Sequence, residues 1–146
     1  GIMVNKAEVV QKIKELRSEL VGIMNNKKEV VMVLALSNYN SNIETVTKWN
    51  MQLVYELLSI ELDGILRCGC AYANEYELAD GTLGELQDSY FNNDVEGVQN
   101  IVYKMHSIRA KCMDYDSIIN HIEHYSNEED KISDEIYELE KSLGMF

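Results

Sequence analysis

The chain has 146 residues, of which 46% are hydrophobic and 26% charged, a composition typical of a soluble globular protein and not of a disordered one. A net charge of −12 argues against direct binding of nucleic acid, because such binding needs cationic side chains that displace counterions. The length fits one domain over residues 1–146, in which Gly1-Ile2 before Met3 is typical of an expression scar.

Long helices are favoured because the sequence contains no proline, the strongest helix breaker. Capping boxes of a hydroxyl residue and a Glu three positions later predict helix starts at Ser41, Thr82 and Ser126, and looser Asn signals stand at Asn5 and Asn93. Gly81 and Gly144 are expected to end helices. With apolar spacings of three and four, these signals predict helices over about 5–25, 27–38, 42–79, 83–92, 94–125 and 127–143.

The segment Val30–Leu36 is the ambiguous element, because it is apolar throughout and rich in β-branched residues. A strand is one interpretation, but a lone strand in a helical chain would leave its backbone groups unpaired. We therefore predict a short buried helix. The segment is also the longest apolar run and is too short to span a membrane, and no signal segment follows the N-terminus. A cytoplasmic protein without membrane contact is expected.

The helix over 42–79 is predicted to be the long centre of the fold. One apolar stripe runs along it, and a second stripe widens the first, which predicts burial against more than one neighbour: Val46, Trp49, Leu53, Leu57 and Ile60, then Val54, Leu58, Leu62 and Ile65. Gly64 and Gly69 are the places where this helix could bend. We predict an all-α fold, an elongated helical bundle with this long central helix and a second long helix over 94–125.

Motifs for metal, phosphate or nucleophilic chemistry are missing from the sequence, which has no Glu-x-x-His, His-Glu-x-x-His, Cys-x-x-Cys or glycine-rich phosphate loop. His121 and His124 lie one helical turn apart and could hold a transition metal weakly, but a firm site would need a third ligand. Cys68, Cys70 and Cys112 are expected to be reduced and packed. We therefore expect no catalytic residue, no cofactor and no enzyme activity.

One histidine, His106, lies in a sequence segment that suggests a chemical role. The segment His106-Ser-Ile-Arg-Ala110 resembles the phosphoacceptor segment of histidine-containing phosphotransfer domains, whose pattern is His-x-Leu-Lys-Gly. The resemblance implies a helical bundle in which His106 accepts a phosphoryl group from a response-regulator aspartate, Arg109 steadies its oxygens and Ala110 lets the partner approach. The match covers five residues, with Arg in place of Lys and Ala in place of Gly. The alternative is an exposed histidine beside an Arg109 that pairs with a nearby acid.

The function that the sequence favours is non-enzymatic binding of another protein, as an interaction or adaptor module. Large aromatic residues dominate interface energies, so the candidate contacts are Trp49, Tyr39, Tyr72 and Phe91. The wide apolar surface of the helix over 42–79 also suggests a homodimer. Two alternatives are a phosphotransfer module using His106 and an acidic mimic of nucleic acid, since residues 51–100 hold ten Asp/Glu against one Arg.

Overall fold

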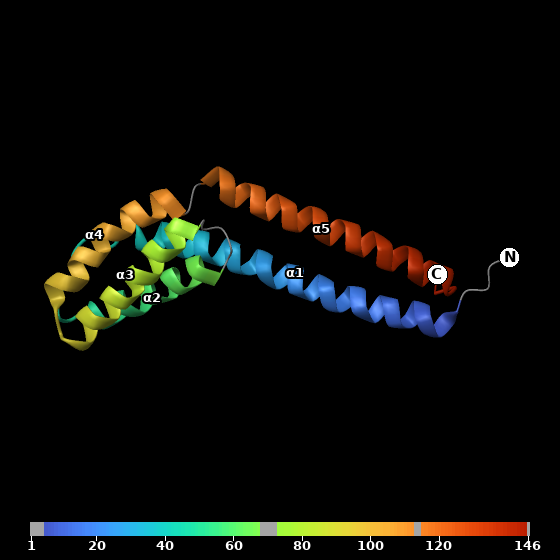
Figure 1. The fold of residues 1–146 in the computed structure, drawn as a ribbon, viewed down its shortest axis with the longest axis horizontal. Coiled ribbons are helices and arrows are strands. Elements are labelled where there is room, and N and C mark those ends of the chain that lie inside the picture. The colour runs from blue at the N-terminus through green and yellow to red at the C-terminus, as the bar shows by residue number, and fades with distance from the viewer. Residues whose placement is uncertain (1–4, 68–72, 113–114, 146) are drawn as a thin grey trace. The chain divides into compact units, whose positions relative to one another are not determined.

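A computed structural model describes residues 5–67, 73–112 and 115–145. They form five α-helices (Figure 1): α1 (Lys6–Asn40), α2 (Met51–Arg67), α3 (Ala73–Phe91), α4 (Val95–Cys112) and α5 (Tyr115–Ser142). No strand occurs in these ranges, so the all-α class is confirmed, and Val30–Leu36 is helical within α1. None of the helices, as far as the structure describes them, is long and apolar enough to cross a membrane.

The described chain divides into two compact units, and the prediction of a single domain stays a prediction. The hairpin unit comprises residues up to Lys28 and from Ile122 onward, and the bundle unit comprises Glu29–His121. Helix α1 contributes to both units, because it runs unbroken from Lys6 to Asn40. The two helices expected over 5–25 and 27–38 are therefore wrong. Asn25 and Asn26, where the two predicted helices meet, cost a helix only a few tenths of a kcal/mol each, at roughly the level of most polar residues.

The helix expected over 42–79 is wrong at its start, because residues 43–47 are irregular and α2 begins at Met51. The hydroxyl of Thr47 accepts hydrogen bonds from the amides of Trp49 and Asn50, at 3.2 and 3.3 Å, while the Asn50 side chain accepts one from the Thr47 amide at 2.7 Å. This reciprocal cap lies six residues after the predicted cap at Ser41, and α2 begins nine residues later than expected. Ser41 instead follows the end of α1, where its hydroxyl donates to the Asn38 carbonyl at 2.7 Å.

Three other boundary signals fall inside helices. Thr82 is fully buried within α3, and its hydroxyl donates to the Leu78 carbonyl at 2.8 Å, so it is satisfied without capping anything. Gly81 lies beside it in α3, and Ser126 lies inside α5. The helices expected over 94–125 and 127–143 are wrong at the boundary between them, since α5 runs unbroken from Tyr115 to Ser142; residues 113–114, between α4 and α5, lie outside the described residues.

Three terminal signals act close to where the sequence places them. The Asn5 side chain caps α1 by accepting from the Ala7 and Glu8 amides, as expected. Helix α4 is capped one residue later than predicted, by Asp94, whose carboxylate accepts from the Gly97 amide at 2.9 Å. Gly144 ends α5 with a φ of +73°, which places it in the left-handed conformation that glycine tolerates.

The core of the bundle unit is mostly apolar and lies where α2, α3 and α4 pack on one another and on the last turns of α1, with Ile118 added from α5 (Figure 1). Its largest fully buried apolar side chains are Leu58, Leu62, Ile65, Leu86, Met105, Ile108 and Ile118. Gly64 marks a close approach of α1 and α2, because a Cβ placed there would lie 2.4 Å from Cγ2 of Val33. Gly64 therefore serves close packing between two helices.

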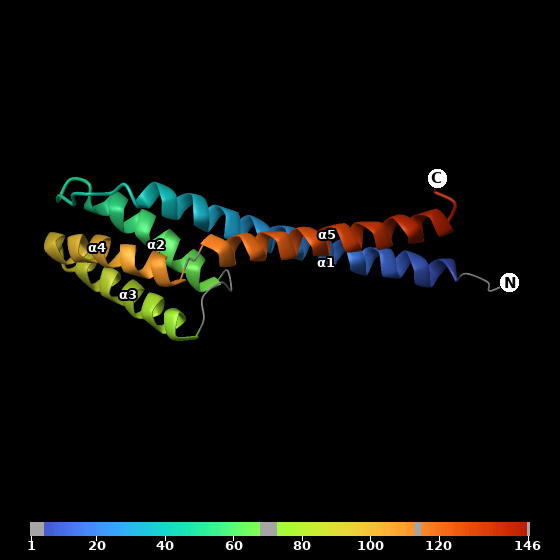
Figure 2. The same ribbon diagram turned by 90° about the horizontal axis from the view of Figure 1, so that it is seen from above.

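In the hairpin unit, residues 6–28 of α1 and 122–142 of α5 run antiparallel, side by side (Figures 1 and 2). The buried side chains between them are Ile13, Leu16, Ile132 and Ile136. Partly buried apolar residues extend this seam in both directions: Val9, Leu20, Ile23, Leu139 and Leu143. Ion pairs join the two helices, between Arg17 and Glu140 and, at 3.4 Å, between Lys27 and Glu129.

Gly64→Ala should destabilise the protein by about 1–3 kcal/mol, because the added methyl group overlaps Val33 and α1 must move away from α2. Gly22→Ala is the matched control, since open space surrounds this helical glycine and alanine should stabilise the helix by about 0.5–1 kcal/mol. Urea denaturation followed by circular dichroism measures both changes. Equal effects of the two substitutions would contradict the close approach.

Candidate protein-interaction site

The first of the two apolar stripes predicted for the helix over 42–79 lies mostly at the surface, so its expected burial is wrong except at Val46. Trp49 is 87% exposed, Leu53 is 57% exposed, and Ile60 is exposed as well. The second stripe, one residue further along, is the buried one: Val54, Leu58, Leu62 and Ile65. A helix turns one side to its neighbours, and α3 and α4 cover the second stripe, which leaves the first without cover.

Helix α1 contributes three residues to the same surface. Val33 approaches Gly64, and Asn40 binds Glu61, so this part of α1 runs antiparallel to α2. In an antiparallel pair, the residues that precede the contact positions on each helix project to the same side. On α1 these are Met32, Leu36 and Tyr39, and on α2 they are Leu53, Leu57 and Ile60. We call these six residues together with Trp49 the α1–α2 face.

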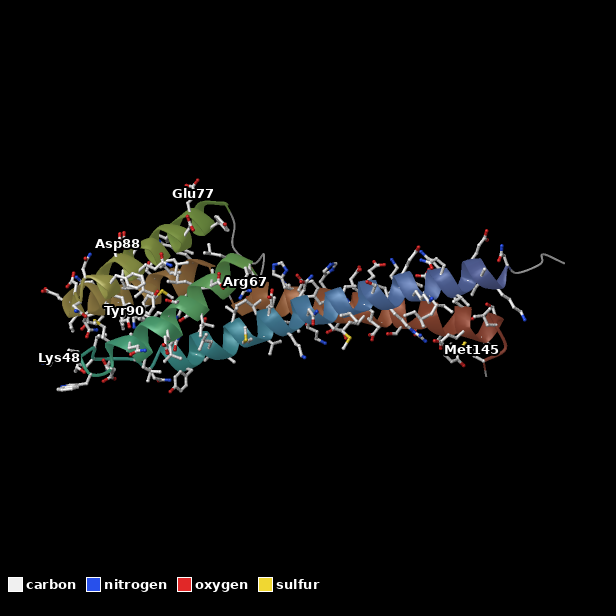
Figure 3. The ribbon with its side chains drawn as sticks, turned by 90° about the horizontal axis from the view of Figure 1, so that it is seen from below. Lys48, Arg67, Glu77, Asp88, Tyr90 and Met145 are labelled. Atoms are coloured by element: carbon white, nitrogen blue, oxygen red, sulfur yellow. The ribbon has the colours of Figure 1, made fainter. Side chains whose placement is uncertain are left out.

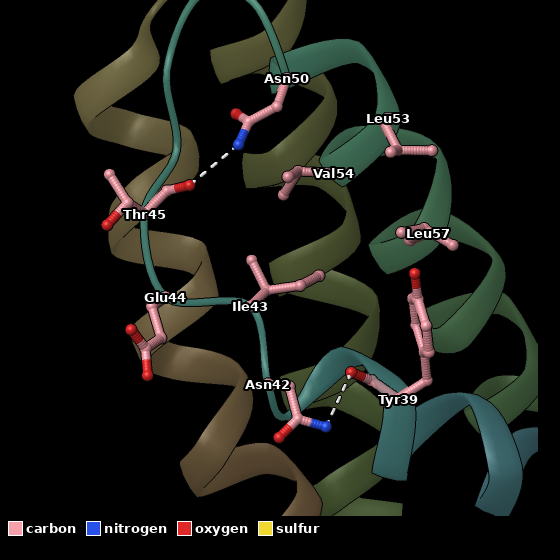
Figure 4. A pocket seen from close by; sticks show the side chains of 9 residues that line it. All are labelled: Tyr39, Asn42, Ile43, Glu44, Thr45, Asn50, Leu53, Val54 and Leu57. Atoms are coloured by element: carbon pink, nitrogen blue, oxygen red, sulfur yellow. Dashed lines mark hydrogen bonds between the residues drawn. The ribbon is translucent and has the colours of Figure 1, made fainter.

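A pocket of about 360 Å³ lies at one end of the α1–α2 face (Figure 4). The Tyr39 ring stands beside Leu57 and Leu53 on one side of it, and Ile43 of the loop after α1 lies opposite (Figure 4). Its remaining walls are Val54 and the polar residues Asn42, Glu44, Thr45 and Asn50. The pocket is thus apolar between the helices and polar along the loop, which suits a side chain entering from outside.

The loop that carries Trp49 is held by side chains from elsewhere. Gln99 of α4 accepts a hydrogen bond from the Val46 amide at 2.7 Å and donates one to the Glu44 carbonyl at 2.9 Å. The side chain of Val46 is itself buried. Asn50 adds a bond from its amide nitrogen to the Thr45 carbonyl at 3.0 Å (Figure 4). The exposed indole therefore projects from a fixed backbone.

Lys48 and Phe91 are two further exposed residues at this end of the bundle unit. The ammonium of Lys48 (Figure 3) lies 5.3 Å from the centre of the Trp49 ring, within range of a cation–π contact. Phe91 is 73% exposed, but it packs edge-on against Tyr55 and Tyr90, whose rings stack at 4.0 Å on another side of α2. Phe91 is therefore exposed as expected and lies outside the α1–α2 face.

Beneath the α1–α2 face lies a buried ionic cluster centred on Glu61 of α2, which is fully buried. Arg109 of α4 donates two hydrogen bonds to its carboxylate, from Nε at 2.7 Å and from Nη2 at 2.8 Å. Ser37 and Asn40 of α1 each donate one more, both at 2.9 Å. Four donors thus satisfy one carboxylate, which is the condition for keeping a charge inside a protein.

The same cluster fixes the spacing between α1 and α2. The side-chain amide of Asn40 also donates to the carbonyl of Leu57 at 3.1 Å, so one residue of α1 holds both the carboxylate and the backbone of α2. Two polar atoms at its edge, Oδ1 of Asn40 and Nη1 of Arg109, have no partner in the part of the chain that the structure describes. Sequence reasoning missed Glu61, although an acid in the register of Val54, Leu58 and Ile65 was a usable signal.

The structure separates His106 from the residue that was expected to assist it. His106 is exposed on α4, whereas the Arg109 side chain is only 11% exposed and bound to Glu61. Arg109 pairing with an acid is the alternative that the sequence left open. In this arrangement the guanidinium is occupied, and the phosphotransfer hypothesis stays a prediction.

The other candidate ligands are dispersed. His121 is half-buried and His124 exposed on α5, and no three His, Cys, Asp or Glu side chains gather into a metal-binding group within the described ranges. Cys68, Cys70 and the interface candidate Tyr72 lie outside the described residues. Comparison of the chain with protein-family models, curated proteins and solved structures found no match.

Glu61→Gln should lower the free energy of unfolding by about 3–5 kcal/mol, because the Arg109 charge stays buried without its counter-charge. Glu85→Gln is the matched control, since Glu85 pairs with Lys104 at 3.0 Å on the surface and its loss should cost no more than about 1 kcal/mol. Urea denaturation gives both values. Equal losses in the free energy of unfolding for the two variants would contradict the proposed importance of the buried cluster.

The phosphotransfer hypothesis predicts that a small phosphodonor labels the chain and that His106→Gln abolishes the label, because the exposed imidazole is the acceptor. His124→Gln is a control for labelling of another exposed histidine. Acid-labile phosphate measured by mass spectrometry gives the answer. Absence of label, or label that survives His106→Gln, would remove the hypothesis.

Proposed function

We propose that this chain is a non-enzymatic protein-interaction module that binds an amphipathic helix of a partner protein on the α1–α2 face. The observation that carries the proposal is an apolar strip along two packed helices, ending in a tryptophan that is 87% exposed on a fixed loop. Exposed apolar surface of this continuity is typical of binding sites, and Trp and Tyr are the residues that most often dominate their energies.

A helix is the partner element that suits an apolar strip along two antiparallel helices with a pocket at one end. The α2 residues of the face run from Leu53 to Ile60, about 11 Å at 1.5 Å per residue, which is about two helical turns, and Trp49 extends the face from the loop before α2. A bound helix would present apolar residues at positions i, i+3 or i+4, and i+7. Its largest anchor would enter the pocket beside Tyr39, and a second would pack near Ile60.

Charged residues lie at both ends of the α1–α2 face. Glu44 and Lys48 lie at the loop end. At the other end Arg67 contacts Glu29 at 3.8 Å and Asp63 at 3.1 Å. Charges at the rim of an interface set orientation and association rate more than affinity. Affinity on this face should therefore come from apolar contact and depend weakly on salt, whereas an acidic mimic of nucleic acid would lose affinity steeply as salt rises.

A display library of amphipathic helical peptides tests the proposal, with the intact chain as bait. We expect selected peptides to share apolar anchors at helical spacing and to lose at least about tenfold in affinity against Leu53→Glu or Trp49→Ala, as hot-spot residues do. Both side chains are exposed, so circular dichroism should show an unchanged fold.

Tyr103→Glu is the matched control, because Tyr103 is a large exposed side chain on α4 that is not part of the α1–α2 face. The Tyr103→Glu substitution should leave the affinity for the selected peptides unchanged. Peptides that bind Leu53→Glu as well as the parent chain but fail to bind Tyr103→Glu would place the binding surface elsewhere. A library that yields no helical binder at all would count against the proposed function.

A further inference from the structure

The hairpin unit has a small core. Four side chains are buried in it, two from α1 and two from α5, because two helices can cover only one stripe of each other. Apolar residues nevertheless continue outside the seam, where Val10, Val21 and Met24 of α1 and Tyr137 of α5 are exposed. This unit therefore has more apolar surface than its own two helices cover.

These exposed residues lie on one side of the hairpin. Each follows a seam position by one residue: Val10 follows Val9, Met24 follows Ile23, and Tyr137 follows Ile136. In an antiparallel pair the residues that follow the seam project to the same side from both helices. A groove of about 160 Å³ supports this placement, because Val10 and Arg17 line it together with Glu140 and Met145 (Met145 is labelled in Figure 3).

We call this side the hairpin face; its α1 residues are Val10, Lys14, Arg17, Val21 and Met24, and its α5 residues are Asp130, Ser133, Tyr137 and Glu140. The opposite side is polar. There α1 presents Glu8, Lys12, Glu15, Glu19 and Gly22, and α5 presents Lys131, Glu135, Glu138 and Ser142. The contrast between the two sides marks the hairpin face as the side that a partner would cover.

The charges of the hairpin unit indicate which partner fits. Residues 6–28 of α1 contain six Lys/Arg and three Glu, whereas residues 122–142 of α5 contain eight Asp/Glu and two Lys. One helix is thus basic and the other acidic, so the hairpin is complementary to a copy of itself that is turned to place unlike helices together.

We propose that the hairpin face binds the hairpin face of a second copy of the chain, about a two-fold axis parallel to the helices. This axis places α1 of one copy over α5 of the other, and every neighbouring pair of helices in the resulting four-helix arrangement is antiparallel. A two-fold axis in the plane of the face but perpendicular to the helices would place α1 over α1 and α5 over α5. Like charges would then meet, which disfavours that arrangement.

Sedimentation of the full chain over a range of concentrations tests this inference. We expect a mass of two chains that dissociates on dilution, and a dissociation constant that rises at least tenfold in Val21→Glu/Met24→Glu. Gly22→Glu is the control for Val21→Glu alone: it adds the same single charge, but on the polar side of α1, where open space surrounds the glycine, and should leave the dimer intact. Circular dichroism should show that all three chains keep their helix content.

Raising the salt concentration tenfold should weaken the dimer, because contacts between basic α1 and acidic α5 are screened; the α1-over-α1 arrangement would instead be strengthened. A mass of one chain at every concentration would overturn the inference. So would a dimer that survives Val21→Glu/Met24→Glu and dissociates with Leu53→Glu, since it would then form through the α1–α2 face. The two outcomes also keep this inference separable from the proposed function, which concerns another partner and other residues.

Discussion

A buried carboxylate is the constraint on which the bundle unit depends. Glu61 is fully buried, and an ionised carboxylate inside a protein is tolerated only when its lone pairs are satisfied and its charge is balanced. Arg109 supplies the charge and two donors, while Ser37 and Asn40 supply two donors from α1. Since those donors must reach one point, α1 and α4 can pack on α2 in one register only. That register leaves the first apolar stripe of α2 beside Tyr39 at the surface.

The same cluster explains why a motif can be present without its usual context. Arg109 lies three residues after His106, as the resemblance to phosphotransfer domains requires, yet its guanidinium points into the core. A sequence pattern specifies spacing along a helix, whereas the direction of a long side chain depends on what the neighbouring helices offer. Here α2 carries the buried Glu61 carboxylate, which has no other counter-charge among the described residues. Attraction to this carboxylate sets the orientation of the Arg109 side chain.

The all-α class and several helix ends could be predicted from the sequence, because they depend on local chemistry. Asn5 and Gly144 act as expected since a cap and a left-handed turn involve only a few neighbouring residues. The helix start predicted at Thr82 is wrong because a hydroxyl can also donate a hydrogen bond to a carbonyl of its own helix, as Thr82 does. The stripe that includes Leu53, Leu57 and Ile60 was predicted to be buried together with its neighbour because the two adjacent stripes look alike in sequence, and Glu61, in register with the second stripe, indicated which one is enclosed.

The two hydrogen bonds of Gln99 to the loop before α2 affect how the pocket on the α1–α2 face can change over evolutionary time. Its amide bonds only to main-chain atoms, the Val46 nitrogen and the Glu44 oxygen, so the shape of the loop does not depend on the side chains at positions 44 and 45. Those side chains line the pocket, and replacing them would leave both main-chain bonds of Gln99 in place. One glutamine on a neighbouring helix thus separates the residues that maintain the loop from the residues that select what enters it, and new specificity can arise there without a new fold.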